Sequence, residues 1–239
     1  PPPPHLFFFP AQPANLDSST SRGLGDVYKR QVKSDCGPIR KKNEDAVFPL
    51  ESGSSELPIK AGVFDGMGGH KKGEVASDLA YKTMYEDLNN ITDYVNAANK
   101  DILEYQSSNE EAKGMGTTMT VVEIAQNGIL SLAHVGDSRC YVLSNRSLIQ
   151  ITEDENVPGY QNVLTQALGS KERLKIQNKD FQLSSGDVVF LCTDGIYNEV
   201  GDEYLKNKLL DGINAESLVG EVLLQNPKDN ISAIIINVI

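Results

Sequence analysis

Short β-strand-like runs dominate this sequence and limit the folds that it can adopt. They are rich in β-branched residues, several alternate apolar and polar positions, and most are bounded by Gly, Pro, Asn or Asp. The runs are DAVFPL, IKAGVFD, TTMTVVEI, ILSLAHVGD, RCYVLS, SLIQIT, LKIQNKDFQL, DVVFLCT and ISAIIINVI. Many consecutive runs are separated by only a short turn, which favours antiparallel pairing.

Helical patterns occur in two blocks between these runs. Residues Gly73–Leu88 and about Thr92–Glu110 lie between IKAGVFD and TTMTVVEI, and about Glu203–Leu210 and Ala215–Gln225 precede the last run. A doubly wound parallel sheet would need a helix after most strands. The grouping instead predicts an α+β fold of antiparallel sheets with helices packed outside them.

Composition limits the possible partners. The chain has 239 residues, 39% of them hydrophobic, which is enough for one large core. Its net charge of −11 argues against nucleic acid or an anionic membrane surface as the main partner. No apolar run approaches the roughly 20 residues that span a bilayer. Three widely spaced cysteines favour a reducing compartment, so we expect a cytoplasmic protein.

The first 31 residues differ from the rest. Four prolines, three phenylalanines and a Ser/Thr/Gly stretch show no helix or strand period, so we interpret residues 1–31 as a disordered segment that is not native to the domain. The domain is then residues 32–239.

Four aspartates lie next to strand-like runs. Asp65, Asp137 and Asp194 each follow an apolar run, whereas Asp229 precedes one. Because the end of one antiparallel strand lies beside the start of its neighbour, the four carboxylates are expected to meet at one sheet edge. An isolated Asp-Gly pair would more simply mark a turn.

Clustered carboxylates repel one another unless a cation lies between them. An all-oxygen ligand set selects Mg²⁺ or Mn²⁺ over zinc or copper. Two such ions about 4 Å apart can activate a water molecule and hold a phosphoryl group. Gly66 can offer its carbonyl oxygen as a further ligand, and Gly68 and Gly69 leave room for water.

Seven motifs in order make the chain resemble a known family. They are RKKNEDA, VFDGMGGH, GMGTTMT, AHVGDSRCYVL, LTQALG, CTDGIYN and DNISAIII. Together they are similar to the bacterial form of the PPM (type 2C) metal-dependent protein serine/threonine phosphatases. The resemblance covers about residues 32–239 and implies two antiparallel β-sheets sandwiched between layers of α-helices.

The resemblance also implies roles for individual residues. Asp65 would bridge two core ions, with the Gly66 carbonyl on one of them. Asp194 and Asp229 would complete the ligands of the second ion, and Asp137 would join Asp194 in holding a possible third.

Three more residues follow from the same resemblance. Glu44 would bind water on the metal, Asp45 would support that shell, and Arg40 would bind the phosphate. A guanidinium group matches two phosphate oxygens, which agrees with the last of these roles. For His134, orienting the GDSR turn is favoured over a direct catalytic role, and for His70, capping the helix that starts near Gly73 is favoured over metal ligation.

Two positions depart from the family pattern. Met67 stands where eukaryotic members have a histidine proposed as general acid. Residues 155–163, ENVPGYQNV, form a shorter flap than many bacterial relatives have, so a more open cleft is expected.

The predicted activity is hydrolysis of phosphoserine or phosphothreonine in proteins by water activated between two Mn²⁺ or Mg²⁺ ions, without a phosphoenzyme. The expected partners are phosphorylated proteins and an opposing serine/threonine kinase, and a monomer is expected. Two alternatives remain open: a catalytically silent relative that binds phosphoproteins, and a hydrolase of small phosphate esters.

Overall fold

Two antiparallel β-sheets form the centre of the protein in a computed structural model, which describes residues 28–55, 57–67 and 72–239. The strands of the first sheet, in spatial order, are β3 (Gly53–Ser55), β1 (Tyr28–Asp35), β14 (Ile231–Asn237), β13 (Val188–Cys192), β8 (Arg139–Ser144) and β9 (Ser147–Gln150). Those of the second are β12 (Gln177–Gln182), β7 (Ile129–Val135), β6 (Met119–Ile124), β4 (Ile59–Met67) and β2 (Asp45–Phe48), with β5 (Gly116–Thr117) paired to β4. The predicted antiparallel pairing is therefore confirmed.

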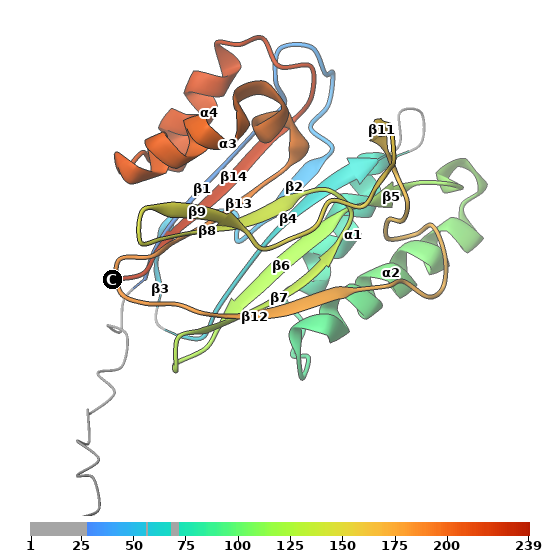
Figure 1. Cartoon of the computed structure of the whole chain (residues 1–239). Coiled ribbons are helices and arrows are strands. Elements are labelled where there is room, and N and C mark those ends of the chain that lie inside the picture. The colour runs from blue at the N-terminus through green and yellow to red at the C-terminus, as the bar shows by residue number, and fades with distance from the viewer. Residues whose placement is uncertain (1–27, 56, 68–71) are drawn as a thin grey trace, which may run out of the picture.

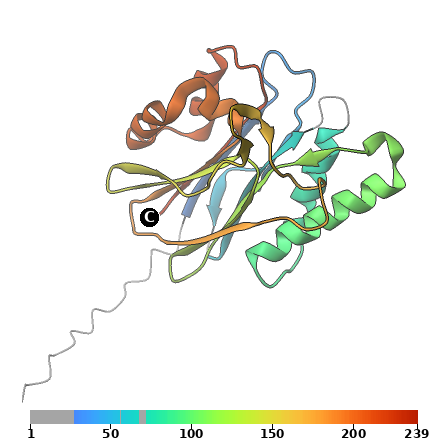
Figure 2. The same ribbon diagram turned by 45° about the vertical axis from the view of Figure 1, so that its right-hand side comes forward.

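Helices cover the outer face of each sheet. Helices α1 (Gly73–Thr83) and α2 (Ile91–Ser108), followed by a 3₁₀ turn η1 (Glu110–Ala112), pack on the second sheet. Helices α3 (Asp194–Leu210) and α4 (Ala215–Leu223) pack on the first. Figures 1 and 2 show the two helical layers on opposite sides of the paired sheets. This is the predicted four-layer arrangement.

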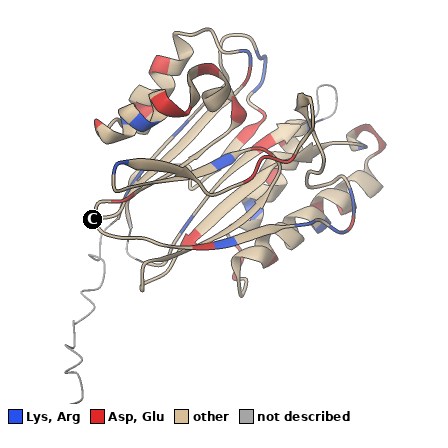
Figure 3. Cartoon of the chain, in the orientation of Figure 1, with Lys and Arg blue, Asp and Glu red and all other residues tan. Residues whose placement is uncertain are grey.

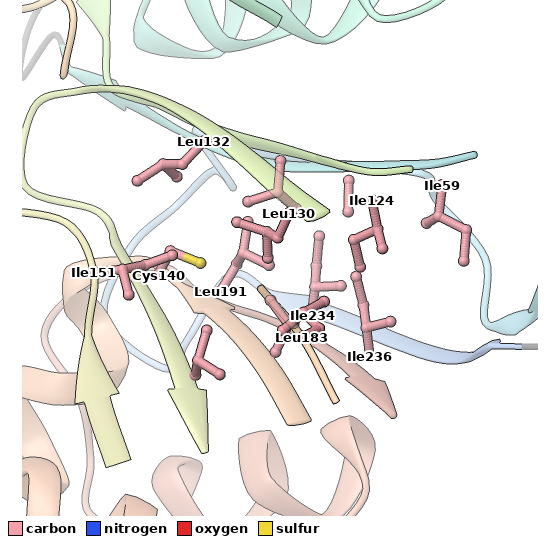
Figure 4. Close-up of a cluster of buried hydrophobic side chains, with 14 of the residues drawn as sticks. Ile59, Ile124, Leu130, Leu132, Cys140, Ile151, Leu183, Leu191, Ile234 and Ile236 are labelled. Atoms are coloured by element: carbon pink, nitrogen blue, oxygen red, sulfur yellow. The ribbon is translucent and has the colours of Figure 1, made fainter. Parts of the chain in front are cut away.

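The apolar faces of the two sheets pack on each other to form the central core. Leu130 and Leu132 of β7 meet Leu191 of β13 and Ile234 of β14 there, as Figure 4 shows. The alternation of these residues along their strands explains the match between sequence and structure, because every second side chain of a strand points to the same face. Cys140 lies in this core, and Cys192 lies beneath the α3 and α4 layer, so both thiols are buried.

Strand β1 is not among the predicted runs, and it begins within the segment interpreted as disordered. Residues Tyr28–Asp35 form β1, and its register with β14 runs from Lys29 opposite Asn237 to Asp35 opposite Ile231. Residues 28–31, which we had assigned to the N-terminal segment, are thus part of the folded domain. The expectation of disorder for the remainder of that segment concerns residues 1–27, which lie outside the described part of the chain. Gly68, Gly69 and His70 also lie outside it.

Helix α3 is longer than expected. We predicted a helix over Glu203–Leu210, but the helix begins at Asp194. Gly201, with φ of 72°, interrupts it and divides it into two segments. The first segment, 194–200, was missed because the CTDGIYN motif has turn-forming residues and no apolar period.

In the parts of the chain that the structure describes, we find no helix with the length and apolar character that crossing a membrane requires.

Candidate metal and phosphate site

A cavity of about 760 Å³ opens where strand ends of the two sheets meet. Its lining includes all four predicted aspartates, Asp65, Asp137, Asp194 and Asp229. Arg40, Glu44 and Gly66 line it as well, whereas Asp45 does not. The structure therefore brings seven of the eight predicted site residues to one cavity, although they come from separate parts of the sequence.

Strand pairing explains why the aspartates converge. Strand β13 ends at Cys192, which pairs with Ala233 of β14, so Asp194 and Asp229 lie at the same end of two neighbouring strands. On the second sheet, Asp65 of β4 pairs directly with Asp45 of β2. The packing of the two sheets then places both edges beside one cavity.

Burial of the carboxyl groups changes their acidity. Burial, reinforced by Asp45 and Asp194, raises the pKa of Asp65 well above its usual range. Burial, together with Asp137 and Asp229, raises the pKa of Asp194 to about 7. A cluster of this kind carries an excess of negative charge that a bound cation would neutralise.

Asp45 lies behind the cavity, and its Oδ1 atom is buried. Its Oδ2 atom accepts hydrogen bonds from Thr193 Oγ1 at 2.9 Å and Ser232 Oγ at 2.7 Å. Burial nevertheless raises its pKa to about 7. Asp45 therefore ties β2 to both strand ends of the first sheet, which suits the supporting role predicted for it.

The donor chemistry of the cavity fits a hard divalent cation. The side chains are carboxylates, and the buried Oδ1 atoms of Asp45 and Asp194 have no hydrogen-bond partner. Unpaired buried oxygens are costly unless a ligand or solvent completes them. Within residues 28–55, 57–67 and 72–239, however, no three side chains already converge in a preformed metal cluster.

Arg40 takes part in the same electrostatic network. Its Nη2 atom donates to Asp229 Oδ2 at 2.6 Å, and its Nε atom donates to the carbonyl oxygen of Lys228 at 3.2 Å. Nη1 lies 3.7 Å from Glu44 Oε2. The guanidinium thus faces the carboxylates and remains 39% exposed, so it is accessible from the cavity.

The flap is a short β-hairpin of β10 (Asn156–Val157) and β11 (Tyr160–Leu164) at the rim of the cavity. Asn162, Val163 and Leu164 line the cavity. Figure 3 shows acidic residues near the strand ends beside this hairpin and also on the helical layers.

Two asparagines contact the predicted ligands, and sequence reasoning missed both. Asn156 Nδ2 of the flap donates to Asp137 Oδ2 at 2.9 Å, and Asn198 Nδ2 donates to Asp194 Oδ2 at 3.2 Å. Asn198 lies four residues after Asp194, so a helix predicted to start at Asp194 would have placed it on the same face. No local pattern could have found Asn156.

A buried histidine next to the GDSR turn holds the turn by hydrogen bonding. His134 is buried, and its Nε2 atom lies 3.0 Å from the Gly136 carbonyl oxygen while Nδ1 lies 2.7 Å from Thr120 Oγ1. Burial lowers the pKa of His134. The histidine therefore orients the turn through hydrogen bonding, as expected, and it does not line the cavity.

Comparison with known proteins identifies the family. The family model described as protein phosphatase 2C matches residues 40–223. The chain belongs to the protein phosphatase 2C family. It is therefore a protein phosphatase, and the resemblance inferred from the seven motifs is confirmed.

Bacterial relatives agree with this assignment. The serine/threonine phosphatase stp of Listeria monocytogenes is 29% identical over 240 residues, which cover 86% of this chain and 94% of that protein. The crystal structure of the Mycobacterium tuberculosis serine/threonine phosphatase PstP superposes with a TM-score of 0.79 at 26% identity, covering 89% of this chain and 99% of that one. A catalytic-domain structure of PstP with two manganese ions has a TM-score of 0.77 at 28% identity, with coverage of 89% and 99%.

Proposed function

We propose that this family member hydrolyses phosphoserine and phosphothreonine in protein substrates and that it requires two Mn²⁺ or Mg²⁺ ions. The observation that carries the proposal is the convergence of four buried or half-buried aspartates and Arg40 on one cavity. The structure of PstP with two manganese ions supports the choice and number of ions.

The family resemblance implies which residues would bind each metal ion. Asp65 would be shared between the two ions, with the Gly66 carbonyl on one of them. Asp194 and Asp229 would serve the other, and Asp137 with Asp194 would hold a third. When bound, the ions supply a water of lowered pKa and neutralise charge on the phosphoryl group.

Other residues at the cavity would bind the phosphoryl group and orient water. The guanidinium group of Arg40 has parallel donors that would suit two phosphoryl oxygens once its bond to Asp229 is released. Glu44 would hold water beside the ions, and Asp45 would support that shell. Met67 lines the cavity and offers no proton, so another group must protonate the leaving oxygen.

The test is phosphate release from a phosphothreonine peptide with Mn²⁺, with a chelator, and with Asp194→Ala. Asp187→Ala is a matched control, because Asp187 is buried just before the opposite end of β13 and its carboxylate accepts a local bond from Ser184 N. We expect turnover that requires Mn²⁺ and is abolished in Asp194→Ala but retained in Asp187→Ala. Equal loss in both variants would contradict the assignment of Asp194.

Two further measurements separate the alternatives. Calorimetric titration with Mn²⁺ reports binding without turnover, and a chain that binds Mn²⁺ but never releases phosphate would be a silent relative. Comparison of the phosphopeptide with p-nitrophenyl phosphate tests the substrate class, since a preference for the small ester would contradict a protein substrate.

We also propose that the protein acts as a monomer in the cytoplasm and opposes a serine/threonine kinase. Sedimentation at micromolar concentration tests the oligomeric state, and a stable dimer would contradict the first part.

A further inference from the structure

Asn230 is buried, with 3% of its surface exposed, and its side chain contacts the loop that carries Arg40 and Glu44. This loop, residues 36–44, connects β1 to β2. Asn230 Nδ2 donates to the carbonyl oxygens of Cys36 at 2.8 Å and Lys42 at 3.0 Å. Its Oδ1 atom accepts from Glu44 N at 2.8 Å. One side chain therefore joins the beginning and the end of the loop.

The backbone of Asn230 is equally constrained. Its N–H donates to Asp229 Oδ1 at 2.8 Å. A Cβ atom at Gly195 would lie only 2.0 Å from the Asn230 carbonyl oxygen, so only glycine allows the start of α3 to approach this closely. Asn230 thus contacts the loop, Asp229 and the helix that starts at Asp194.

Resting on the phosphatase function proposed above, we infer that Asn230 is a positioning residue that holds Arg40 and Glu44 in register with Asp229. Asn230 does not line the cavity, so it acts through Arg40 and Glu44 and does not touch the phosphate. Loss of its amide would remove the hydrogen bonds that close the loop. None of the predicted metal ligands would itself be replaced.

Arg40 is the residue whose position should be affected most by loss of the Asn230 amide. It lies in the middle of the loop, and apart from its contacts with Asp229, Lys228 and Glu44 it depends on the loop backbone for its position. Supporting residues of this kind typically change activity by about 10- to 100-fold when replaced. The expected effect is a rise in the KM for phosphate esters and a weaker inhibition by inorganic phosphate, with a smaller change in kcat.

Asn99 provides a matched control in the helical layer of the second sheet. It is also buried, donates from Nδ2 to the carbonyls of Lys171 and Glu172, and accepts from Gly169 N at 2.8 Å. It lies on α2 and does not line the catalytic cavity. Substitution of either asparagine removes a comparable set of buried hydrogen bonds.

The experiment compares Asn230→Ala and Asn230→Asp with Asn99→Ala and Asn99→Asp in the full chain with Mn²⁺. All four variants should lower the melting temperature. Only the Asn230 pair should raise the KM for p-nitrophenyl phosphate and the inhibition constant of inorganic phosphate, by about tenfold. If Asn230→Ala does not fold, the KM and inhibition constant of Asn230→Asp test the inference. Aspartate has the same size as asparagine and keeps an oxygen that can accept from Glu44 N.

A double-mutant cycle with Arg40→Ala tests the route of the effect. If Asn230 acts mainly through Arg40, adding Asn230→Ala to Arg40→Ala should cause little further loss. Full additivity, or Asn230 variants that match the Asn99 controls in KM, would overturn the inference. A wild-type chain without Mn²⁺-dependent turnover would instead contradict the proposed function, so the two failures are distinguishable.

Discussion

Arg40 Nη2 lies 2.6 Å from Asp229 Oδ2, so the guanidinium proposed to bind phosphate pairs with a carboxylate proposed to bind metal. An oxygen that accepts from an arginine is less available to a cation. Binding of an ion at Asp229 should therefore compete with this pair and release Arg40 toward a phosphoryl group. The pair links the two halves of the proposed site.

Replacement of Arg40 by alanine should weaken phosphate binding and leave metal binding intact. We expect the KM for a phosphothreonine peptide to rise about 10- to 100-fold, since hydrogen bonds between charged groups contribute about 1.5–3 kcal/mol. Affinity for Mn²⁺ should be unchanged or tighter, because Asp229 loses a competitor. Steady-state kinetics and calorimetric titration measure the two effects separately.

Arg40→Lys is the control for charge without the planar arrangement of donors, and it should restore only part of the affinity. Because Arg40 is 39% exposed, neither variant should change the free energy of unfolding by more than about 1 kcal/mol. Loss of Mn²⁺ binding in Arg40→Ala would show that the arginine supports the metal site instead.

The metal-free protein should lose stability as the pH rises. Burial raises the pKa of Asp45 and of Asp194 to about 7, above the ordinary value of 3.8. Between those values the folded state binds more protons than the unfolded state, so the free energy of unfolding falls as the pH increases. With chelator present, the melting temperature should be higher near about pH 5.5 than near about pH 7.5.

Asp45→Asn tests this origin, because an amide does not titrate. The variant should show a shallower pH dependence of the melting temperature, with Asp187→Asn as a buried carboxylate control. Saturating Mn²⁺ should also flatten or reverse the dependence for the wild-type chain, since binding favours ionised ligands. An unchanged slope in Asp45→Asn would contradict this account.

Gly66→Ala should disrupt the site through backbone crowding. A Cβ atom there would lie 2.4 Å from the carbonyl oxygens of both Glu44 and Gly73. The strand, the loop and the start of α1 would have to separate, which we expect to cost about 1–3 kcal/mol of unfolding free energy and most of the activity. Thermal denaturation and phosphate release measure these losses.

Gly220→Ala is the matched substitution, because Gly220 lies within α4 with no atom within 4 Å of its added Cβ. It should stabilise the protein by about 1 kcal/mol and leave activity unchanged. If Gly66→Ala and Gly220→Ala had similar effects on stability and activity, the backbone at Gly66 would accommodate the Cβ atom, and this prediction would be wrong.

Asn156→Ala should loosen the flap hairpin. The bond from Asn156 Nδ2 to Asp137 Oδ2 joins β10 to the GDSR turn, and bonds to a charged group contribute about 1.5–3 kcal/mol. Amide hydrogen exchange over residues 156–164 should become several-fold faster. Tyr160→Ala is the control, because Tyr160 is 66% exposed on the same hairpin and lies outside the cavity lining. Equal exchange in both variants would indicate that Asn156 does not anchor the hairpin.

The period of the apolar residues predicted most of the strands. Runs such as ISAIIINVI and DVVFLCT are buried on both faces and almost wholly apolar, so local composition is enough to reveal them. The start of β1 was missed because Tyr28–Gln31 are mostly polar, and they become a strand only through pairing with β14. Local sequence does not contain that pairing.

The clustering of the carboxylates was also predictable from the sequence. Asp65, Asp137, Asp194 and Asp229 each stand at a strand end, and antiparallel pairing makes their convergence a consequence of the fold. The roles of Asn156 and Asn230 were not readable, because their partners lie far away in the chain. For Asn230 the separations reach 194 residues.

The sequence by itself determined the element types, the antiparallel arrangement and the carboxylate chemistry, because these depend on residue periodicity and on residue type at strand ends. The tertiary structure alone decided which side chains face the carboxylates. Arg40 forms an ion pair with Asp229, Asn230 accepts a hydrogen bond from the loop that carries Arg40, and Asn156 of the flap donates to Asp137. Such contacts depend on how two sheets and their loops pack in three dimensions, which no single stretch of sequence encodes.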